Sequence, residues 1–377
     1  MKFSNIAGQE EIKQRLRRTV SDNRVSHAQL FLGPEGSGKL AMTLAYAQYI
    51  NCSARTPLDS CGVCPSCIKF EKLAHPDLHF IYPVATTKEV DKDPVSKKFI
   101  HHWRDLVEST GGYLSVDDWY KKIGLENKQG IINTEDCNEI VRTLSYKSYE
   151  SEYKVMIIWM IEKLYHAAAP KILKILEEPP DKTLFLLISE QSDQILPTIL
   201  SRTQLVKFRP LNDDELVNAL RADNQSDEST IANIRYLANG NLNLARKIME
   251  SGESDQADFE LFRSWMRTLY KRDIQEIYKL TSEFHGLGRE RQKKFFLYAL
   301  KATRYCLMNR IENNSALRID GEELKFIRDF TPFINPANIG LMNEGFNKAY
   351  YHIERNGSAN IIFMDLSLKM TGWLRMK

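Results

Sequence analysis

A glycine-rich turn near the start of the chain stands between an apolar segment and a helical one. Residues 26–32 predict a short buried strand, and residues 40–50 carry apolar side chains at helical spacing without proline or glycine. The turn between them, Gly33-Pro34-Glu35-Gly36-Ser37-Gly38-Lys39, fits the pattern G-x-x-x-x-G-K. Because a strand, a glycine turn and a helix in this order begin a βα unit, the sequence predicts an α/β domain.

The turn has the chemistry of a phosphate-binding loop in all but its last position. Gly33, Gly36 and Gly38 would let backbone amides face phosphate oxygens, and Lys39 would reach the β and γ phosphates. The next position needs a hydroxyl to hold Mg²⁺, and Leu40 has none. Two interpretations stay open, a vestigial nucleotide loop and a glycine turn without a ligand, and we expect no functional Mg²⁺ site.

Two further apolar runs predict buried parallel strands, at residues 155–161 and 183–189. The helical stretch 167–178 lies between them and is ended by Pro179-Pro180. Beyond Pro210 the strand signal stops, and the rest of the chain predicts helices joined by short polar turns. The expected fold class is α/β followed by all-α, and 377 residues suffice for two or three domains.

Composition excludes several classes of protein. The chain is 43% hydrophobic and 27% charged, which is ordinary for a folded protein. Its net charge of +3 is small, with a balance of +8 over residues 261–377 and −5 over the first 260, which disfavours a sequence-specific DNA-binding protein. No apolar run is long enough for a membrane span, and the start lacks the pattern of a signal peptide, so we expect a cytoplasmic protein.

Four of the six cysteines crowd into one short segment. Cys52, Cys61, Cys64 and Cys67 form the pattern C-x8-C-x2-C-x2-C. Four thiolates at this spacing can share one tetrahedral ion and leave no coordination position open for water. The alternative, free cysteines that gather by chance, is disfavoured by this spacing, so the sequence predicts structural zinc.

A nucleotide hydrolase of this layout also needs two acids at the end of a central strand, one for Mg²⁺ and one to activate water. Trp159 and Met160 stand at those positions, and the first acid is Glu162. Two separate positions that would handle Mg²⁺ are therefore apolar. We expect this chain to have no intrinsic ATPase activity.

Arg202 and a basic cluster at residues 289–294 each have a structural and a functional interpretation. Arg202, in Ser201-Arg202-Thr203, could form a surface ion pair or offer its planar fork to phosphate oxygens, and spacing alone favours the ion pair. Arg289, Arg291, Lys293 and Lys294 precede an aromatic run, and an amphipathic helix is favoured over a contact with a DNA backbone.

Several motifs, taken together, match one known family. They are Ser26-His27-Ala28, the loop Gly33 to Lys39, the four spaced cysteines, Lys171-Ile172-Leu173-Lys174-Ile175-Leu176-Glu177-Glu178-Pro179-Pro180 and Leu200-Ser201-Arg202. On these motifs the sequence resembles clamp-loader subunits of bacterial DNA polymerase III, which are of the AAA+ class. The resemblance covers roughly residues 5–245.

Departures from the family pattern indicate which type of subunit the sequence resembles. The family's motor subunits keep intact nucleotide motifs, whereas the delta-prime type has lost them and kept the arginine. Leu40, Trp159 with Met160, and Asn243 in place of a sensor arginine all favour the delta-prime type. The resemblance then implies that Arg202 is a finger for a neighbouring subunit's ATP, although Thr203 departs from the cysteine usual after that arginine. The alternative is an active gamma/tau-like ATPase with degenerate magnesium motifs.

The resemblance also implies a domain layout and partners. We expect an AAA+ α/β domain over residues 1–210, a helical lid over 211–252 and a helical collar for oligomerisation over 253–377. The first domain would hold the zinc module at 52–67, and residues 83–130 would be an insertion or mobile surface segment without an assigned task. The implied partners are the other clamp-loader subunits in a hetero-oligomeric ring, the sliding clamp and, through the complex, primer-template DNA.

Overall fold

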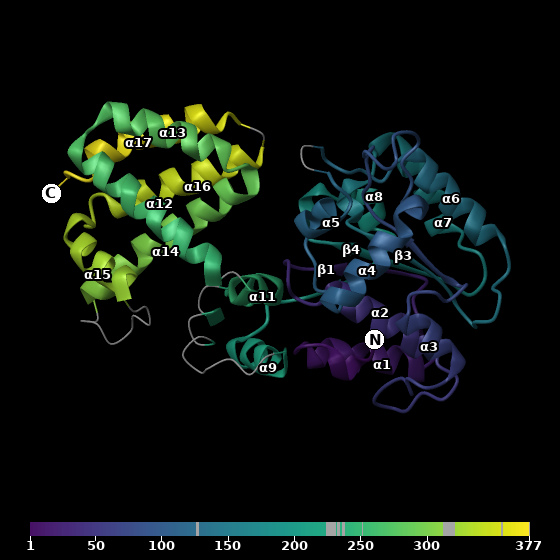
Figure 1. Cartoon of the computed structure of the whole chain (residues 1–377). Helices are drawn as coiled ribbons and strands as arrows, with labels where there is room; N and C mark the ends of the chain where they lie inside the picture. Colours follow the sequence, from purple (N-terminus) through teal and green to yellow (C-terminus); the bar gives the residue numbers. More distant parts are fainter. Residues whose placement is uncertain are drawn as a thin grey trace. The chain divides into compact units, whose positions relative to one another are not determined.

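The structure of the protein is a computed structural model that describes residues 1–125, 128–223, 231, 234–235, 238–250, 252–311, 321–355 and 357–376 (Figure 1). The chain forms two compact units, Met1–Asp227 with Ile234–Arg246, and Glu228–Asn233 with Lys247–Lys377. Part of the predicted lid, residues 211–252, lies outside the described residues. The division of the chain into three domains stays a prediction.

The first unit is built on a five-stranded, all-parallel sheet in the order β2-β3-β4-β1-β5. The predicted strands are present, which confirms the α/β class, and β4 is buried along its whole length. The sequence did not predict the two edge strands, β2 and β5, because both are only four residues long. The strands are β1 Ala28–Leu32, β2 Leu78–Ile81, β3 Lys154–Trp159, β4 Thr183–Ser189 and β5 Gln204–Lys207.

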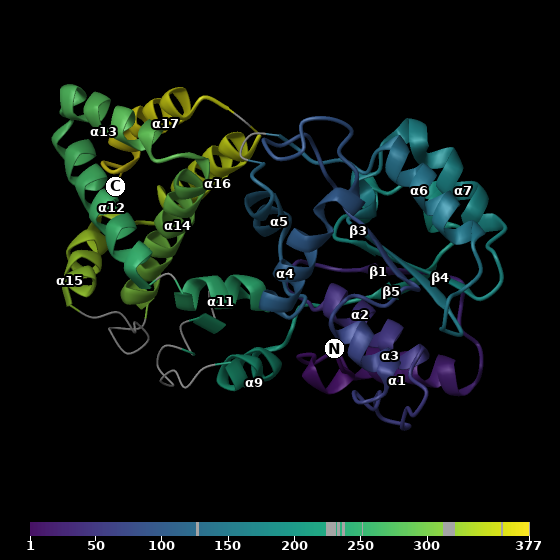
Figure 2. The ribbon, with the colours of Figure 1, turned by 45° about the vertical axis from the view of Figure 1, so that its right-hand side comes forward.

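Helices cover the sheet of the first unit. Helix α2 (Lys39–Ile50) is buried along its whole length, as an apolar helix next to a sheet should be. Figure 2 shows α6 (Thr134–Ser145) and α7 (Ala169–Glu177) side by side, and both contribute to one core with β1, β3 and β4. The other α-helices described in this unit are α1 Glu10–Ser21, α3 Pro65–Glu71, α4 Ile100–Thr110, α5 Val116–Lys122, α8 Pro197–Leu200 and α9 Asp213–Asp223. Helix α11 (Leu242–Glu250) begins in this unit and leaves it after Arg246.

The segment 83–130, expected as an insertion or mobile surface segment, is packed on an aromatic cluster. Trp103 in α4 and Trp119 in α5 are fully buried and meet edge to face with ring centroids 5.4 Å apart. Tyr82 stacks on Trp103 at 4.3 Å, and Trp119 Nε1 donates a hydrogen bond to the Pro83 carbonyl at 2.8 Å. Burial of these large rings gives this segment, which we call the insertion after the prediction, a core that its weak sequence periodicity did not predict.

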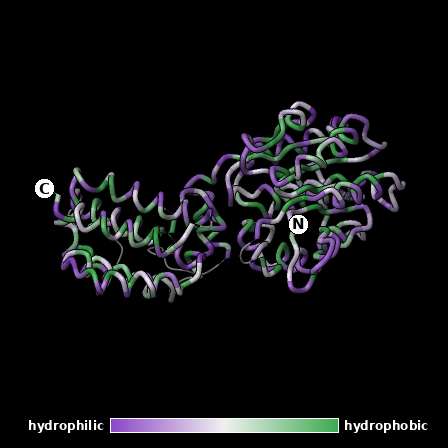
Figure 3. The backbone as a smooth tube through the Cα atoms, turned by 90° about the horizontal axis from the view of Figure 1, so that it is seen from above, coloured by the Kyte–Doolittle hydropathy of each residue, from purple (hydrophilic) through white to green (hydrophobic). Residues whose placement is uncertain are grey.

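The residues of the second unit that the structure describes form helices and no strand, as predicted. Its core is aromatic: Phe363 stacks on Trp265 and on Phe284, with centroids 4.8 Å and 4.2 Å apart. Hydrophobic and hydrophilic residues alternate along its helices (Figure 3). The aromatic residues Phe295 and Phe296, which follow the basic cluster, are fully buried, as the amphipathic interpretation expects, but Lys293 of the cluster is buried as well, so its charges do not all face solvent. The helices are α12 Gly252–Lys271, α13 Ile274–Gly286, α14 Arg289–Ile311, α15 Gly321–Phe330, α16 Ile339–Glu354 and α17 Ala359–Trp373.

Among the described residues, no helix is both long enough and apolar enough to cross a membrane.

Candidate nucleotide loop and metal centre

The glycine loop joins β1 to α2, at the carboxyl end of a central strand of the sheet. Gly36 and Gly38 have φ angles of 71° and 85°, in the left-handed region that favours glycine. A Cβ atom on Gly36 would overlap the side chain of Asn241, and a Cβ on Gly33 would lie 2.7 Å from the Phe208 carbonyl oxygen. Backbone conformation and close packing therefore both require glycine in this loop.

Lys39 is directed at groups of the protein itself. Its Nζ donates a hydrogen bond to the Pro34 carbonyl at 2.6 Å and lies 3.5 Å from Glu190 Oε1. The Ser37 hydroxyl donates to the same carbonyl at 2.7 Å, which closes the loop on itself. The lysine side chain is only 5% exposed, and burial lowers its pKa although Glu190 acts in the other direction. Two of its three donors are thus directed at protein oxygens.

Three carboxylates lie around this lysine. Glu190 directly follows β4, and burial raises its pKa although Lys39 counteracts the shift. Glu162 Oε1 accepts a hydrogen bond from the Glu190 backbone N–H at 2.9 Å, while its Oε2 is buried with no hydrogen-bond partner among the described residues. Glu35, inside the loop, accepts from Asn243 Nδ2 at 2.9 Å. Phosphate oxygens placed here would meet negative charge that one lysine does not outweigh.

Sequence reasoning missed Glu35 and Glu190 as residues of this site. The signal was present, since Glu35 lies within the glycine motif and Glu190 comes directly after an apolar strand whose end meets the loop. In parallel sheets the carboxyl ends of the strands share one edge, so an acid at such an end lies near a loop from a neighbouring strand.

The end of β3 is apolar. Trp159 is the last residue of the strand and is 3% exposed, and its ring centroid lies 5.2 Å from that of Trp103 in the insertion. Met160 is 4% exposed and has a φ angle of 59°. Both side chains are therefore part of the protein interior.

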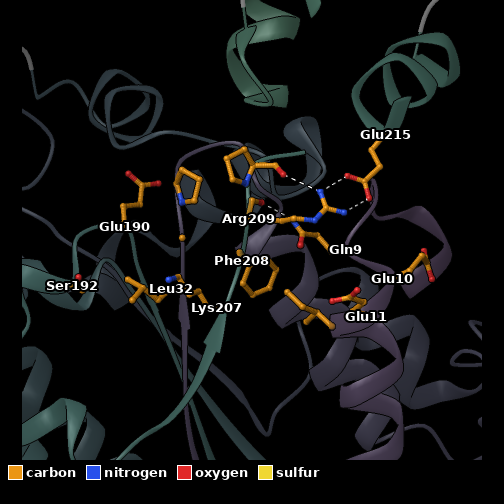
Figure 4. Close-up of a pocket in the computed structure, with 14 residues that line it drawn as sticks. Gln9, Glu10, Glu11, Leu32, Glu190, Ser192, Lys207, Phe208, Arg209 and Glu215 are labelled. Carbon is orange, nitrogen blue, oxygen red and sulfur yellow. Dashed lines mark hydrogen bonds and ion pairs between the residues drawn. The ribbon is translucent and has the colours of Figure 1, made fainter. Parts of the chain in front are cut away.

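A groove of about 840 Å³ borders the start of the loop (Figure 4). Glu10, Glu11, Glu190 and Glu215 line it together with Arg209, whose two terminal nitrogens each donate to Glu215 at 2.7 Å. That bidentate pair neutralises both charges, so Arg209 is engaged within the protein and not directed at an anion in the groove. Its other lining residues include apolar side chains and Lys207.

The four predicted cysteines come together. Their Sγ atoms all lie within 4.8 Å of one another, and Cys61 and Cys67 are 3.9 Å apart. Four sulfurs around one tetrahedral zinc at about 2.3 Å would be about 3.8 Å apart, so the cluster has the size that such an ion requires. Cys64 caps the N-terminus of α3, and its Sγ accepts a hydrogen bond from the Cys67 backbone N–H. The cluster can therefore hold a metal ion such as zinc.

The thiol pKa values also fit a cation site. Burial acts to raise the pKa of Cys64, but hydrogen bonds, first among them that from the Cys67 backbone N–H, lower it to about 6. The pKa of Cys67 is raised by burial and by the neighbouring thiols of Cys52 and Cys64. Closely packed thiols cannot all ionise without a positive charge among them, and a divalent cation would supply it.

Arg202 lies just after α8 and is one-third exposed. Its Nε donates a hydrogen bond to Glu177 Oε1 at 2.6 Å, and its Nη1 donates to the Thr198 carbonyl at 2.9 Å. In the isolated chain, Arg202 therefore forms the surface ion pair that spacing alone favoured. Glu177 comes from the Leu-Glu-Glu-Pro-Pro segment, so two of the quoted family motifs meet at this point. The pair stays accessible for a partner.

The fold and the glycine loop define an α/β protein of the P-loop class. Residues 8–212 match the family described as DNA polymerase III, delta subunit, and because the match spans more than half of the 377 residues, the chain belongs to that family. The resemblance to DNA polymerase III clamp-loader subunits that the motifs indicated is confirmed.

Individual relatives include two kinds of subunit. The delta' subunit of Bacillus subtilis DNA polymerase III is 28% identical over 250 residues, which are 66% of this chain and 61% of that protein. The gamma/tau subunit of Mycobacterium bovis is 27% identical over 209 residues, or 55% of this chain and 29% of that protein. The chain thus matches less than two-thirds of the length of these relatives. The comparisons do not distinguish the two subunit types.

Among solved structures, a DNA polymerase III gamma subunit-related protein of Thermotoga maritima aligns over 96% of this chain and 100% of its own length. It shares 15% identity at a TM-score of 0.41, which is too low to carry an argument.

Proposed function

We propose that this protein is a delta-prime-like, non-hydrolysing subunit of the DNA polymerase III clamp loader. In this role it helps to load the sliding clamp on primed DNA, within a ring of clamp-loader subunits that includes gamma/tau and delta types. Membership of the family supports a role in this complex, and the apolar residues Leu40, Trp159 and Met160 support the subunit type.

The observation that carries the proposal is the state of Lys39. A working phosphate-binding loop offers its lysine and its amides to the nucleotide, whereas here the lysine is held by Pro34 and Glu190. Leu40 supplies no hydroxyl for Mg²⁺, and the end of β3 supplies no acid. Binding of a nucleotide would require Lys39 to leave buried partners and phosphate to approach carboxylates, so the residues present do not fit Mg-ATP.

The alternative is an active gamma/tau-like ATPase. Its support is the similarity to gamma/tau subunits, at nearly the same identity as to the delta' subunit. Such an ATPase would have to hold Mg²⁺ with other residues, because Leu40, Trp159 and Met160 carry no ligand atom for it. Glu35, Glu162 and Glu190 are the carboxylates around Lys39. Glu190 lies 3.5 Å from the lysine, and Glu162 Oε1 accepts the Glu190 backbone N–H, which leaves Glu162 Oε2 as the oxygen without a hydrogen-bond partner among the described residues.

Arg202 has a proposed role toward a neighbouring subunit. Its guanidinium is permanently charged and planar, and it is held at the surface by an acid that also faces solvent. In a ring of such subunits, Arg202 would leave Glu177 and bind the ATP of the neighbouring subunit. The arginine would then meet the charge that develops on the transferring phosphoryl group.

The cysteine cluster has a proposed structural role, with zinc as the ion. Cys52, Cys61, Cys64 and Cys67 would fill a tetrahedral shell, so the ion would stabilise the segment 52–67 rather than take part in chemistry. For the rest of the chain we propose a helical lid at 211–252 and an oligomerisation collar at 253–377.

Co-purification tests the proposal. The tagged protein, expressed in its own cell, should recover an AAA+ subunit with intact nucleotide motifs together with a delta-type subunit, in a stable complex. The reconstituted complex should load the sliding clamp on primed DNA, and omission of this chain should stop loading. Recovery of the chain without any such subunit would contradict the proposed role.

A further inference from the structure

The insertion contacts the glycine loop. Between α4 and α5 the chain turns at Gly111 and Gly112 and then places Tyr113 inside the first unit, where it is 5% exposed. The Tyr113 hydroxyl oxygen accepts a hydrogen bond from the Ala7 backbone N–H at 3.1 Å. A Cβ atom on Gly38 would lie 2.9 Å from that oxygen. The hydroxyl therefore lies against the loop glycine that precedes Lys39.

The ring of Tyr113 is enclosed on its other sides by helices. Gly112 packs so closely on the first turn of α2 that a Cβ would lie 3.1 Å from the Ala41 backbone nitrogen. From α11, the Arg246 guanidinium lies over the ring, 5.0 Å from its centroid, and donates a hydrogen bond to the Thr110 carbonyl at 3.2 Å. Tyr113 thus lies among Ala7, α2 and the part of α11 up to Arg246, all within the first unit.

These surroundings are those in which proteins hold a nucleobase. A glycine loop binds the phosphates at the N-terminus of the following helix, so the sugar and base must extend from there past the helix's first turn. A base site offers a flat apolar slot, a cation over the ring and a backbone N–H for a ring acceptor. Tyr113 occupies such a slot: α2 packs beside it, Arg246 lies over its ring and the Ala7 N–H is bound by its hydroxyl.

We propose that the insertion carries an internal ligand, with Tyr113 filling the base subsite of the degenerate nucleotide pocket. The class of ligand that it replaces is a purine nucleoside. This deepens the proposed non-hydrolysing function and rests on it, since a working ATP site would need this slot open. It assigns a task to the insertion, which is to keep the pocket closed.

The phosphate side of the pocket is closed by the chain as well. Asn241 packs directly on Gly36, and the Leu242 backbone N–H donates to the Gly36 carbonyl at 3.4 Å. Asn243 Nδ2 lies 2.9 Å from Glu35 Oε1 and 3.3 Å from Asp118 Oδ2, so the start of α11 contacts both the loop and the insertion. The loop, the insertion and the start of α11 are thus held in one arrangement by side chains, without a nucleotide.

Removal of the tyrosine ring tests the proposal. Tyr113→Ala should leave a slot that accepts adenosine, and calorimetric titration of the full-length protein should show at least a ten-fold gain in affinity over the unaltered chain. ADP should gain no more than adenosine, because Glu35 and Glu190 disfavour the phosphates. Tyr113→Phe keeps the ring in the slot, so this variant should bind neither adenosine nor ADP more tightly than the unaltered chain.

Tyr120→Ala is the matched control, because Tyr120 is also in the insertion and its hydroxyl also accepts a backbone N–H, that of Gly130. It should gain no adenosine binding. A gain in both alanine variants would show general loosening and overturn the proposal, as would a folded Tyr113→Ala protein that binds adenosine no better than the unaltered chain. If Tyr113→Ala fails to fold, Tyr113→Leu takes its place with the same outcomes.

The same titrations separate this inference from the proposed function. Tight ADP binding by the unaltered chain, lost in Lys39→Ala, would overturn the role of Tyr113, whereas ATP turnover by the unaltered chain would contradict the proposed function. An unaltered chain that binds no nucleotide, with no gain in Tyr113→Ala, would leave the proposed function standing and overturn only the role of Tyr113.

Discussion

Substitution of Arg202 by alanine should separate the role of this residue in catalysis from its role in stability. In the isolated chain the arginine is paired with Glu177, and the two side chains are 33% and 49% exposed. A solvent-exposed pair of this kind contributes about 0.2–1 kcal/mol to the free energy of unfolding. Loss of the pair should therefore lower the melting temperature by at most about 4 °C.

The expected catalytic effect is much larger. An arginine that meets the transferring phosphoryl group in trans is worth roughly 10³–10⁵ in rate, and a thousand-fold loss corresponds to about 4 kcal/mol of transition-state stabilisation. That exceeds the contribution of the ion pair several-fold. The loss should fall on the one neighbouring ATP site, while the other sites of the complex continue to turn over. Clamp loading should therefore suffer more than total ATP turnover.

The assay uses complexes reconstituted with wild-type, Arg202→Ala, Arg202→Lys or Glu177→Gln protein, with clamp-stimulated ATPase and clamp loading as readouts. Lysine should substitute poorly because it lacks the planar fork. Glu177→Gln is the matched control, since it removes the ion pair and keeps the arginine, and it should load clamps normally. If complexes with Arg202→Ala protein load clamps and hydrolyse ATP as fast as wild-type complexes, Arg202 does not act on a neighbouring ATP site. It would then be only a member of a surface ion pair.

Three further predictions concern the first unit. Elemental analysis should find one zinc per chain, and Cys52→Ser should lose it together with stability; well under one zinc in protein never exposed to chelator would contradict the site. Trp103→Ala should lower the free energy of unfolding by about 3–5 kcal/mol in urea titrations, because the ring is fully buried among other aromatic rings; a change below about 1 kcal/mol would speak against a packed insertion. Burial raises the pKa of Asp136 to about 6, so the folded state binds more protons than the unfolded chain between about pH 4 and pH 6. The stability from this group is full at low pH and is lost as pH rises through that window, and Asp136→Asn should remove this slope from a plot of unfolding free energy against pH; an unchanged slope would contradict the assignment.

Local pattern sufficed for much of the fold. The β1–loop–α2 unit and the strands β3 and β4 follow from apolar runs, a glycine motif and a proline stop, and the structure confirms them. The cysteine cluster follows from spacing alone, since C-x2-C steps bring thiols together whatever the rest of the chain does.

The insertion could not be predicted in the same way. Its helices α4 and α5 depend on contacts between residues far apart in the sequence, such as Trp103 with Trp159 of β3. The pairing of Tyr113 with Ala7 likewise spans more than a hundred residues. Tertiary packing of this kind leaves no periodicity in a short segment, so the sequence indicated only weak structure there.

ATP turnover by the purified chain alone tests the central claim most directly. The account predicts that wild-type protein hydrolyses ATP no faster than a Lys39→Ala variant, because Lys39 is held by Pro34 and Glu190 and because Leu40, Trp159 and Met160 offer Mg²⁺ no ligand. Restoring a single residue, as in Leu40→Thr, should not create activity, since the acids at the end of β3 would still be missing. Turnover at ordinary enzyme rates, about 1 per second or more, that Lys39→Ala abolishes would contradict the account.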